Sequence, residues 1–134
     1  MFAPVDETGK IDVESLHRLV KLYQGNGVSA IVVPVVASEV KKPSLFERAW
    51  IVTETISAAQ KTPMIGGILG DNGDSAARLA ESAMKTGCCA VMYRAPDKVV
   101  DNAPKVFEYF GMIASAGMES LIVQNFPFWA GDST

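Results

Sequence analysis

The chain has 134 residues, of which 49% are hydrophobic and 20% are charged, and its formal net charge at pH 7 is −3. This composition is that of a globular domain and excludes an intrinsically disordered chain. No basic patch and no apolar stretch of bilayer-spanning length stands out, which excludes nucleic acid and membrane as expected partners. Met1 is not followed by the basic and apolar regions of a signal peptide. We therefore expect one domain over residues 1–134, located in the cytoplasm.

Helical patterns and short apolar runs alternate along the sequence. In chain order the pattern predicts a helix at 12–24, an apolar run at 30–36, a helix at 44–60, a run at 63–69, a helix at 74–85, a run at 89–93, a helix from 102 to about 116 and a run at 121–125. The runs are apolar throughout, which is typical of strands buried on both faces of a parallel sheet. Their spacing of about 30 residues is that of a βαβ unit.

The ends of the predicted helices carry recognisable capping residues. Asp12 is a good N-cap for the first helix, and Ser44 with Glu47 forms a capping box for the second. Pro104 suits the first turn of the fourth helix, where a missing N–H costs little. The apolar face of the second helix is expected at Leu45, Ala49, Val52, Ile56 and Ala59. The apolar face of the fourth is expected at Val106, Phe107, Phe110 and Ile113.

A glycine-rich segment at 66–73 follows a predicted strand and opens a helix, which is also where phosphate-binding loops lie. No G-x-G-x-x-G pattern can be written across it. We therefore interpret the segment as a close-packed strand followed by a tight turn, which argues against nucleotide or flavin binding.

Cys88 and Cys89 are the two cysteines of the chain and enter a predicted strand side by side. They could form a vicinal redox pair or half of a metal site, but no other residues supply ligands at zinc-like spacing. We interpret them as small residues packed at a helix–strand junction, in a reducing cytoplasmic setting. His17 is expected on a solvated helix face. No metal and no cofactor is expected.

An ordered set of short motifs resembles one known family along the whole chain. The matching positions are Ala3-Pro4-Val5, Gly9, Ile11-Asp12, residues 27–33, Glu39, Ser44, Glu47, Arg48, Pro63, Ile65, Gly67, Gly70, Asn125-Phe126-Pro127 and Gly131. This set resembles the dihydrodipicolinate synthase / N-acetylneuraminate lyase family, over the N-terminal half of its members.

The resemblance implies a (β/α)8 barrel, usually a homotetramer, that acts on pyruvate or another small 2-oxo acid. In the family a lysine on the sixth strand forms a Schiff base with the keto carbon, which requires a desolvated amine. A tyrosine at the end of the fifth strand relays protons. Two hydroxyl residues after the second strand bind the carboxylate of the 2-oxo acid.

This chain departs from the family pattern at the catalytic positions. Gln124 stands at the tyrosine position, and glutamine forms hydrogen bonds without shuttling protons at ordinary pH. Val36 and Ala37 replace the hydroxyl pair, so Ser38 is the nearby donor that remains. Asp97 and Lys98 replace the family's paired tyrosines. The sixth-strand lysine falls outside the 134 residues, so the chain by itself is expected to be inactive. Lys98 beside Asp97 should stay protonated and is not expected to replace that lysine.

Three folds are compatible with this length. The favoured one is a partial TIM barrel of about four and a half βα units, with a parallel sheet and a first strand that looks clipped. A half-barrel that pairs with its own copy is the second. A small doubly wound domain of flavodoxin type is the third, although it lacks the phosphate loop or acidic cluster that such a domain needs.

The favoured function is that of a divergent 2-oxo-acid lyase, with substrate over the strand ends at 36–39, 70–72, 94–98 and 124–129. The alternative is a non-catalytic barrel relative that binds a small acid or serves as a subunit. Arg94 could hold an acid group bidentately or take part in a surface ion pair. The predicted substrate-binding residues are Val36, Ala37, Ser38, Arg94, Gln124 and Asn125.

Overall fold

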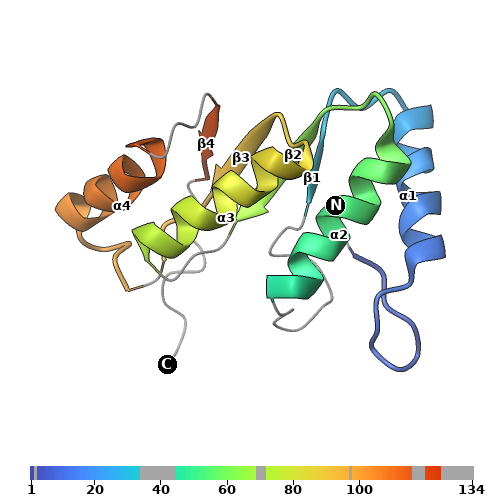
Figure 1. Ribbon diagram of the computed structural model, residues 1–134, viewed down its shortest axis with the longest axis horizontal. Helices are drawn as coiled ribbons and strands as arrows, with labels where there is room; N and C mark the ends of the chain where they lie inside the picture. The colour runs from blue at the N-terminus through green and yellow to red at the C-terminus, as the bar shows by residue number, and fades with distance from the viewer. Residues whose placement is uncertain (2, 34–44, 69–71, 97, 116–119, 125–134) are drawn as a thin grey trace.

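A computed structural model describes residues 1, 3–33, 45–68, 72–96, 98–115 and 120–124. Within these ranges helices and strands alternate (Figure 1). The elements are α1 (Val13–Gly25), β1 (Ile31–Val33), α2 (Leu45–Ala59), β2 (Met64–Ile68), α3 (Gly73–Thr86), β3 (Ala90–Tyr93), α4 (Ala103–Ser115) and β4 (Leu121–Val123). This confirms the predicted order of helices and strands.

The four strands form one parallel sheet in the order β1-β2-β3-β4. Each strand is added on the same side of the preceding one, so the strand order never reverses. A doubly wound sheet requires such a reversal, with strands placed on both sides of the first. The flavodoxin-type alternative is therefore wrong, and the sheet is consistent with a partial TIM barrel.

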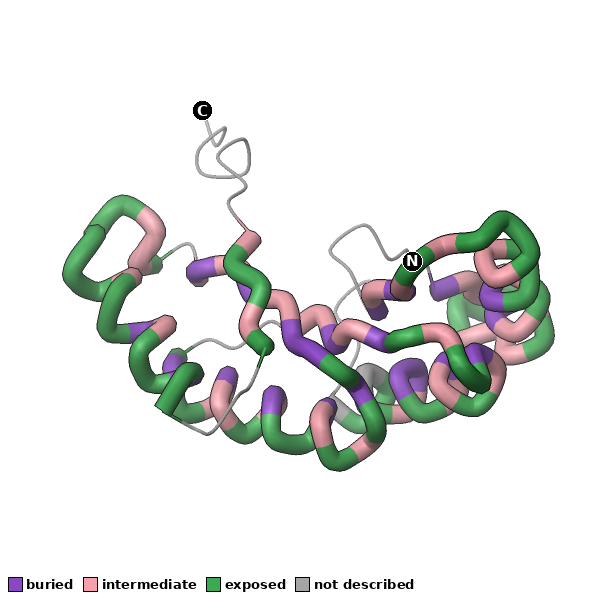
Figure 2. The backbone as a smooth tube through the Cα atoms, turned by 90° about the horizontal axis from the view of Figure 1, so that it is seen from above, coloured by how far each residue is buried: buried purple, intermediate pink, exposed green. Residues whose placement is uncertain are grey.

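The helices lie along one side of the sheet (Figure 2). Helices α2 and α3 pack on the strands, while α1 packs on α2 and α4 packs on α3. Strand residues that face the helices, such as Val33, Val91 and Tyr93, are fully buried. The alternate positions, such as Val32 and Met92, are only half-buried. Within the described residues, the second face of the sheet therefore carries no helical layer.

The helical core was predicted well for α1 and less well for α2 and α4. Leu16 and Val20 of α1 are fully buried, as their spacing indicates. In α2, however, the expected face is wrong at Ala49, which is exposed. The α2 residues that are buried are Ile51, Val52, Thr55 and Ala59. Thr55 satisfies its hydroxyl locally by donating to the carbonyl oxygen of Ile51 at 2.7 Å.

The residues of α4 that face the core differ in part from those expected. Tyr109 and Ile113 are its buried residues, whereas Phe107 is 83% exposed. The helix packs on α3, and the direction of that contact selects the face with Tyr109. The prediction for Ile113 is confirmed and that for Phe107 is wrong.

Side chains cap the starts of α1 and α3. The Asp12 carboxylate accepts from the Ser15 N–H at 3.0 Å, which confirms the predicted N-cap of α1. Asn72 and Ser75 form a reciprocal capping box at α3, although a carboxylate at the third position is the usual partner. Gly87 ends α3 with a φ of 115°, a conformation that glycine adopts without strain. Ser44 of the capping box predicted for α2 lies outside the described residues.

Gly66 confirms the close packing predicted for the glycine-rich strand, whereas residues 69–71 of the predicted turn lie outside the described residues. A Cβ atom at this position of β2 would lie 3.0 Å from the Cβ of Ala83 on α3. It would also lie 3.5 Å from the sulfur of Cys88. The strand and the helix can therefore approach closely because neither carries a large side chain at the contact.

The two cysteines are free thiols in different surroundings. Cys88 is 4% exposed and belongs to the hydrophobic core, whereas Cys89 is exposed and donates to the carbonyl oxygen of Met64 at 3.2 Å. Burial, followed by the neighbouring Cys89 thiol, raises the pKa of Cys88 to about 11. The packing predicted at the helix–strand junction is confirmed for Cys88 and wrong for Cys89, which is exposed.

This difference predicts selective alkylation. Because the raised pKa leaves little thiolate at pH 8, Cys88 should not react with iodoacetamide in the native protein, whereas Cys89 should. In urea both should react. Peptide mass spectrometry after each treatment measures this, and equal native labelling of the two residues would contradict the described packing.

Candidate functional site

The carboxyl ends of the four strands lie along one edge of the sheet, because all four run parallel. Parallel α/β proteins place their ligand sites at this edge. Of the predicted site residues, Arg94 follows β3 and Gln124 follows β4 directly, and both are described. The remaining four, Val36, Ala37, Ser38 and Asn125, lie outside the described residues.

The backbone position of Arg94 is fixed by its neighbour Tyr93, which is packed against α3. The Tyr93 side chain is fully buried, and its hydroxyl donates to the carbonyl oxygen of Ala76 on α3. Burial also raises the pKa of Tyr93 above its usual range, so it stays neutral. Ala95 is buried as well, whereas Arg94 between them is only half-buried. Since side chains alternate along a strand, Arg94 faces the side of the sheet without helices.

Gln124 lies directly beside Arg94 on the neighbouring strand. Its backbone N–H donates to the carbonyl oxygen of Tyr93 at 2.7 Å, and Val123 is paired with Tyr93 in the β3–β4 register. The next residues along the two strands are therefore Arg94 and Gln124. The structure thus brings together two residues that are 30 positions apart and that the sequence analysis assigned to one site.

Lys98 is exposed and lies in the loop after β3. Asp97, expected beside it, lies outside the described residues. That Lys98 is not a nucleophile stays a prediction.

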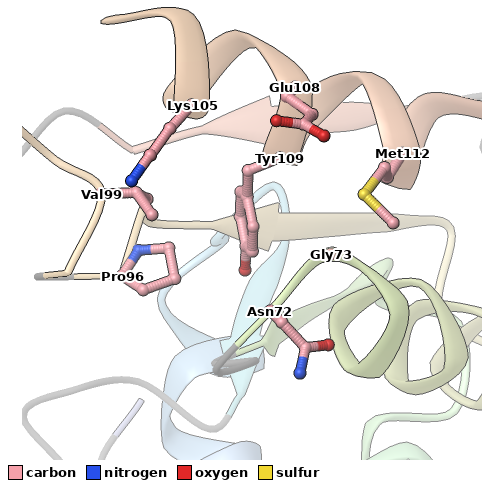
Figure 3. A pocket seen from close by; sticks show the side chains of 8 residues that line it. All are labelled: Asn72, Gly73, Pro96, Val99, Lys105, Glu108, Tyr109 and Met112. Atoms are coloured by element: carbon pink, nitrogen blue, oxygen red, sulfur yellow. The ribbon is translucent and has the colours of Figure 1, made fainter. Parts of the chain in front are cut away.

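A pocket of about 200 Å³ opens between the start of α3, the loop after β3 and the α4 residues that face them (Figure 3). It is lined by Asn72, Gly73, Pro96, Val99, Lys105, Glu108, Tyr109 and Met112. The ring of Tyr109 forms its wall, and the charged ends of Lys105 and Glu108 lie on the α4 side. The pocket belongs to the helical layer and is separate from the face that carries Arg94. Sequence analysis did not predict it, because a lysine and a glutamate three residues apart are typical of a solvated helix face.

The histidine of the chain has a structural partner. His17 of α1 lies 3.2 Å from a carboxylate oxygen of Glu54 on α2, so it joins two helices and is not on a free solvated face as predicted. In the described ranges no three His, Cys, Asp or Glu residues gather as metal ligands would. None of the helices in these ranges combines the length and apolar character that a membrane crossing requires.

A parallel sheet whose strands follow one another in chain order, with its helices along one side, is an arc of a (β/α) barrel. The sequence pattern of the dihydrodipicolinate synthetase family matches residues 1–133. The chain belongs to this family.

Individual relatives and solved structures agree with this assignment. A 4-hydroxy-tetrahydrodipicolinate synthase from Alkalilimnicola ehrlichii is 28% identical over 128 residues, which are 95% of this chain and 44% of that protein. A dihydrodipicolinate synthase from Bacillus anthracis is 27% identical, with a TM-score of 0.88 over 96% of this chain and 44% of the other. A dihydrodipicolinate synthase from Acinetobacter baumannii, in complex with pyruvate, is 25% identical, with a TM-score of 0.88 over 96% of this chain and 44% of the other. The chain thus spans less than half the length of these relatives.

Proposed function

We propose that the chain supplies part of the active site of a divergent 2-oxo-acid lyase that forms a Schiff base with pyruvate or a similar substrate. The observation that carries the proposal is the pairing of Arg94 and Gln124 at the strand ends, in a chain that matches the family over residues 1–133. A related enzyme in complex with pyruvate supports a small 2-oxo acid as the ligand.

In the proposed mechanism the substrate lies across the strand ends. A lysine supplied from outside the 134 residues attacks the keto carbon, and the keto oxygen leaves as water when the imine forms. We propose a relay without tyrosine around Gln124, Asn125 and Ser38, in which the two amides orient the substrate by hydrogen bonds and the Ser38 hydroxyl both donates and accepts one. The substrate contacts are Val36, Ala37, Ser38, Arg94, Gln124 and Asn125. The complete protein is proposed to be a cytoplasmic homo-oligomer.

Borohydride trapping tests this proposal. The complete protein in which the chain occurs is incubated with pyruvate and sodium borohydride, and its mass is measured. We expect one reduced pyruvate adduct on a lysine of the complete protein and none on the 134-residue chain alone. A complete protein that binds pyruvate without any adduct would refute the lyase proposal.

The second candidate function is a non-catalytic relative that binds a small acid or serves as a subunit. Gln124 favours it, because a glutamine at the family's tyrosine position does not transfer protons. Pyruvate binding without an adduct in the same experiment would support this second function.

A further inference from the structure

One flank of α4 is apolar and lies away from α3. In an α-helix, residues three and four positions apart share a face. The side of α4 toward α3 is marked by the residues that line the pocket between the two helices, which are Lys105, Glu108 and Met112 (Figure 3). The flank on the opposite side of the helix has the same spacing and consists of Ala103, Phe107, Phe110 and Ala114. None of these four side chains is polar.

This apolar flank is largely open to solvent within the described residues. Phe107 is 83% exposed, and Ala103 and Ala114 are exposed as well. Phe110 is half-buried, and its ring meets that of Tyr109 edge-on with the centroids 5.3 Å apart. A contiguous exposed apolar patch marks a contact surface, because a helix buries its apolar stripe against another element. The flank therefore has the composition of a packing surface, although no described element covers it.

The order of the elements indicates which element covers the flank. Each strand of the sheet is added on the same side of the preceding strand. Each helix after α1 likewise contacts the helix before it. Among the described residues α4 stands at the end of this row of helices (Figure 1). Because the apolar flank faces away from α3, it lies on the side where the next helix of the series would be added.

The relatives are long enough to supply such a helix. The chain spans 44% of the Alkalilimnicola ehrlichii enzyme and 44% of the Bacillus anthracis structure. We infer that, in the complete protein, the first helix after β4 packs against the apolar flank of α4. That helix is amphipathic, and its apolar stripe has small side chains opposite the Phe107 ring, because a large ring on one helix fits into a groove of the other. The inference rests on membership of the family and does not require the lyase chemistry.

Alkylation of introduced cysteines tests whether the flank is covered. The variants Phe107→Cys and Ala114→Cys of the complete protein are treated with iodoacetamide under native conditions, and the rate at position 107 or 114 is followed by peptide mass spectrometry. We expect both cysteines to react at least about tenfold more slowly than an exposed cysteine, because the covering helix excludes the reagent. The second variant replaces one small residue by another, so it remains informative if Phe107→Cys does not fold.

Ser115→Cys is the matched control. Ser115 is an exposed residue of the same helix but lies outside the apolar flank, and cysteine has nearly the same shape as serine. Its cysteine should react rapidly. Circular dichroism verifies that each variant is folded, and analytical ultracentrifugation at two protein concentrations gives its oligomeric state.

Two results would overturn the inference. One is alkylation of both flank cysteines as fast as that of Ser115→Cys, which would show that the flank is exposed in the complete protein. The other is protection that disappears when dilution separates the subunits, since a second copy of the protein would then be the cover. Protection that persists in the separated subunit supports the inference. Such protection, in a protein that forms no adduct with pyruvate and borohydride, would refute the lyase proposal and leave this inference intact.

Discussion

Replacing Leu16 by alanine is expected to lower the free energy of unfolding by about 2–5 kcal/mol. Leu16 is fully buried in α1, and alanine would leave a cavity that the packed helices fill only in part. Urea unfolding followed by circular dichroism measures the change. The same substitution at Leu22, on the same helix but 59% exposed, is the control and should change the free energy by less than about 0.5 kcal/mol.

The comparison between these two leucines isolates burial from helix propensity, because both changes are leucine to alanine within one helix. A similar loss of stability at the two positions would contradict the packing of α1. An unchanged free energy of unfolding in Leu16→Ala would also contradict the packing of α1.

Gly66→Ala is expected to lower the free energy of unfolding by about 1–3 kcal/mol. The new methyl group would lie 3.0 Å from the Cβ of Ala83, and a Cβ cannot move away unless α3 itself shifts. The change also adds no helix propensity, since Gly66 lies in β2. Thermal or urea unfolding of the variant measures the effect.

Gly111→Ala provides a control with the opposite expected sign. A Cβ at Gly111 meets no heavy atom within 4 Å, and the residue lies inside α4. Alanine is favoured over glycine in a helix by about 0.8–1.0 kcal/mol, so this variant should be more stable than the original. If both substitutions lowered the free energy of unfolding, the contact between β2 and α3 would not be the cause of the loss of stability in Gly66→Ala.

Much of the fold was predictable because strand burial and helix capping are local signals. Apolar runs without alternation indicated a parallel sheet, and Asp12 marked the start of a helix correctly. The helix predicted at 74–85 ends close to the observed end of α3 at Thr86, where the following Gly87 takes a positive φ without strain.

The parts that could not be predicted depend on neighbours distant in the sequence. Which face of α4 is buried is decided by its contact with α3, and this contact turns Phe107 toward solvent and Tyr109 inward. The adjacency of Arg94 and Gln124 depends on the β3–β4 register, for which neither residue carries a local signal. The pocket beside α4 likewise requires the positions of side chains from several elements.

The sequential strand order has a consequence for how the chain folds. In the described residues each strand pairs with the next strand in the chain, and the helices pack on their sequence neighbours. The loops that must close are therefore about one βα unit long, which keeps their entropic cost low. Pairing between parallel strands is nevertheless a non-local contact, so the sheet is expected to form more slowly than a helical bundle, in which contacts are local. The arc can still assemble unit by unit during synthesis, with each completed βα unit serving as the template for the next.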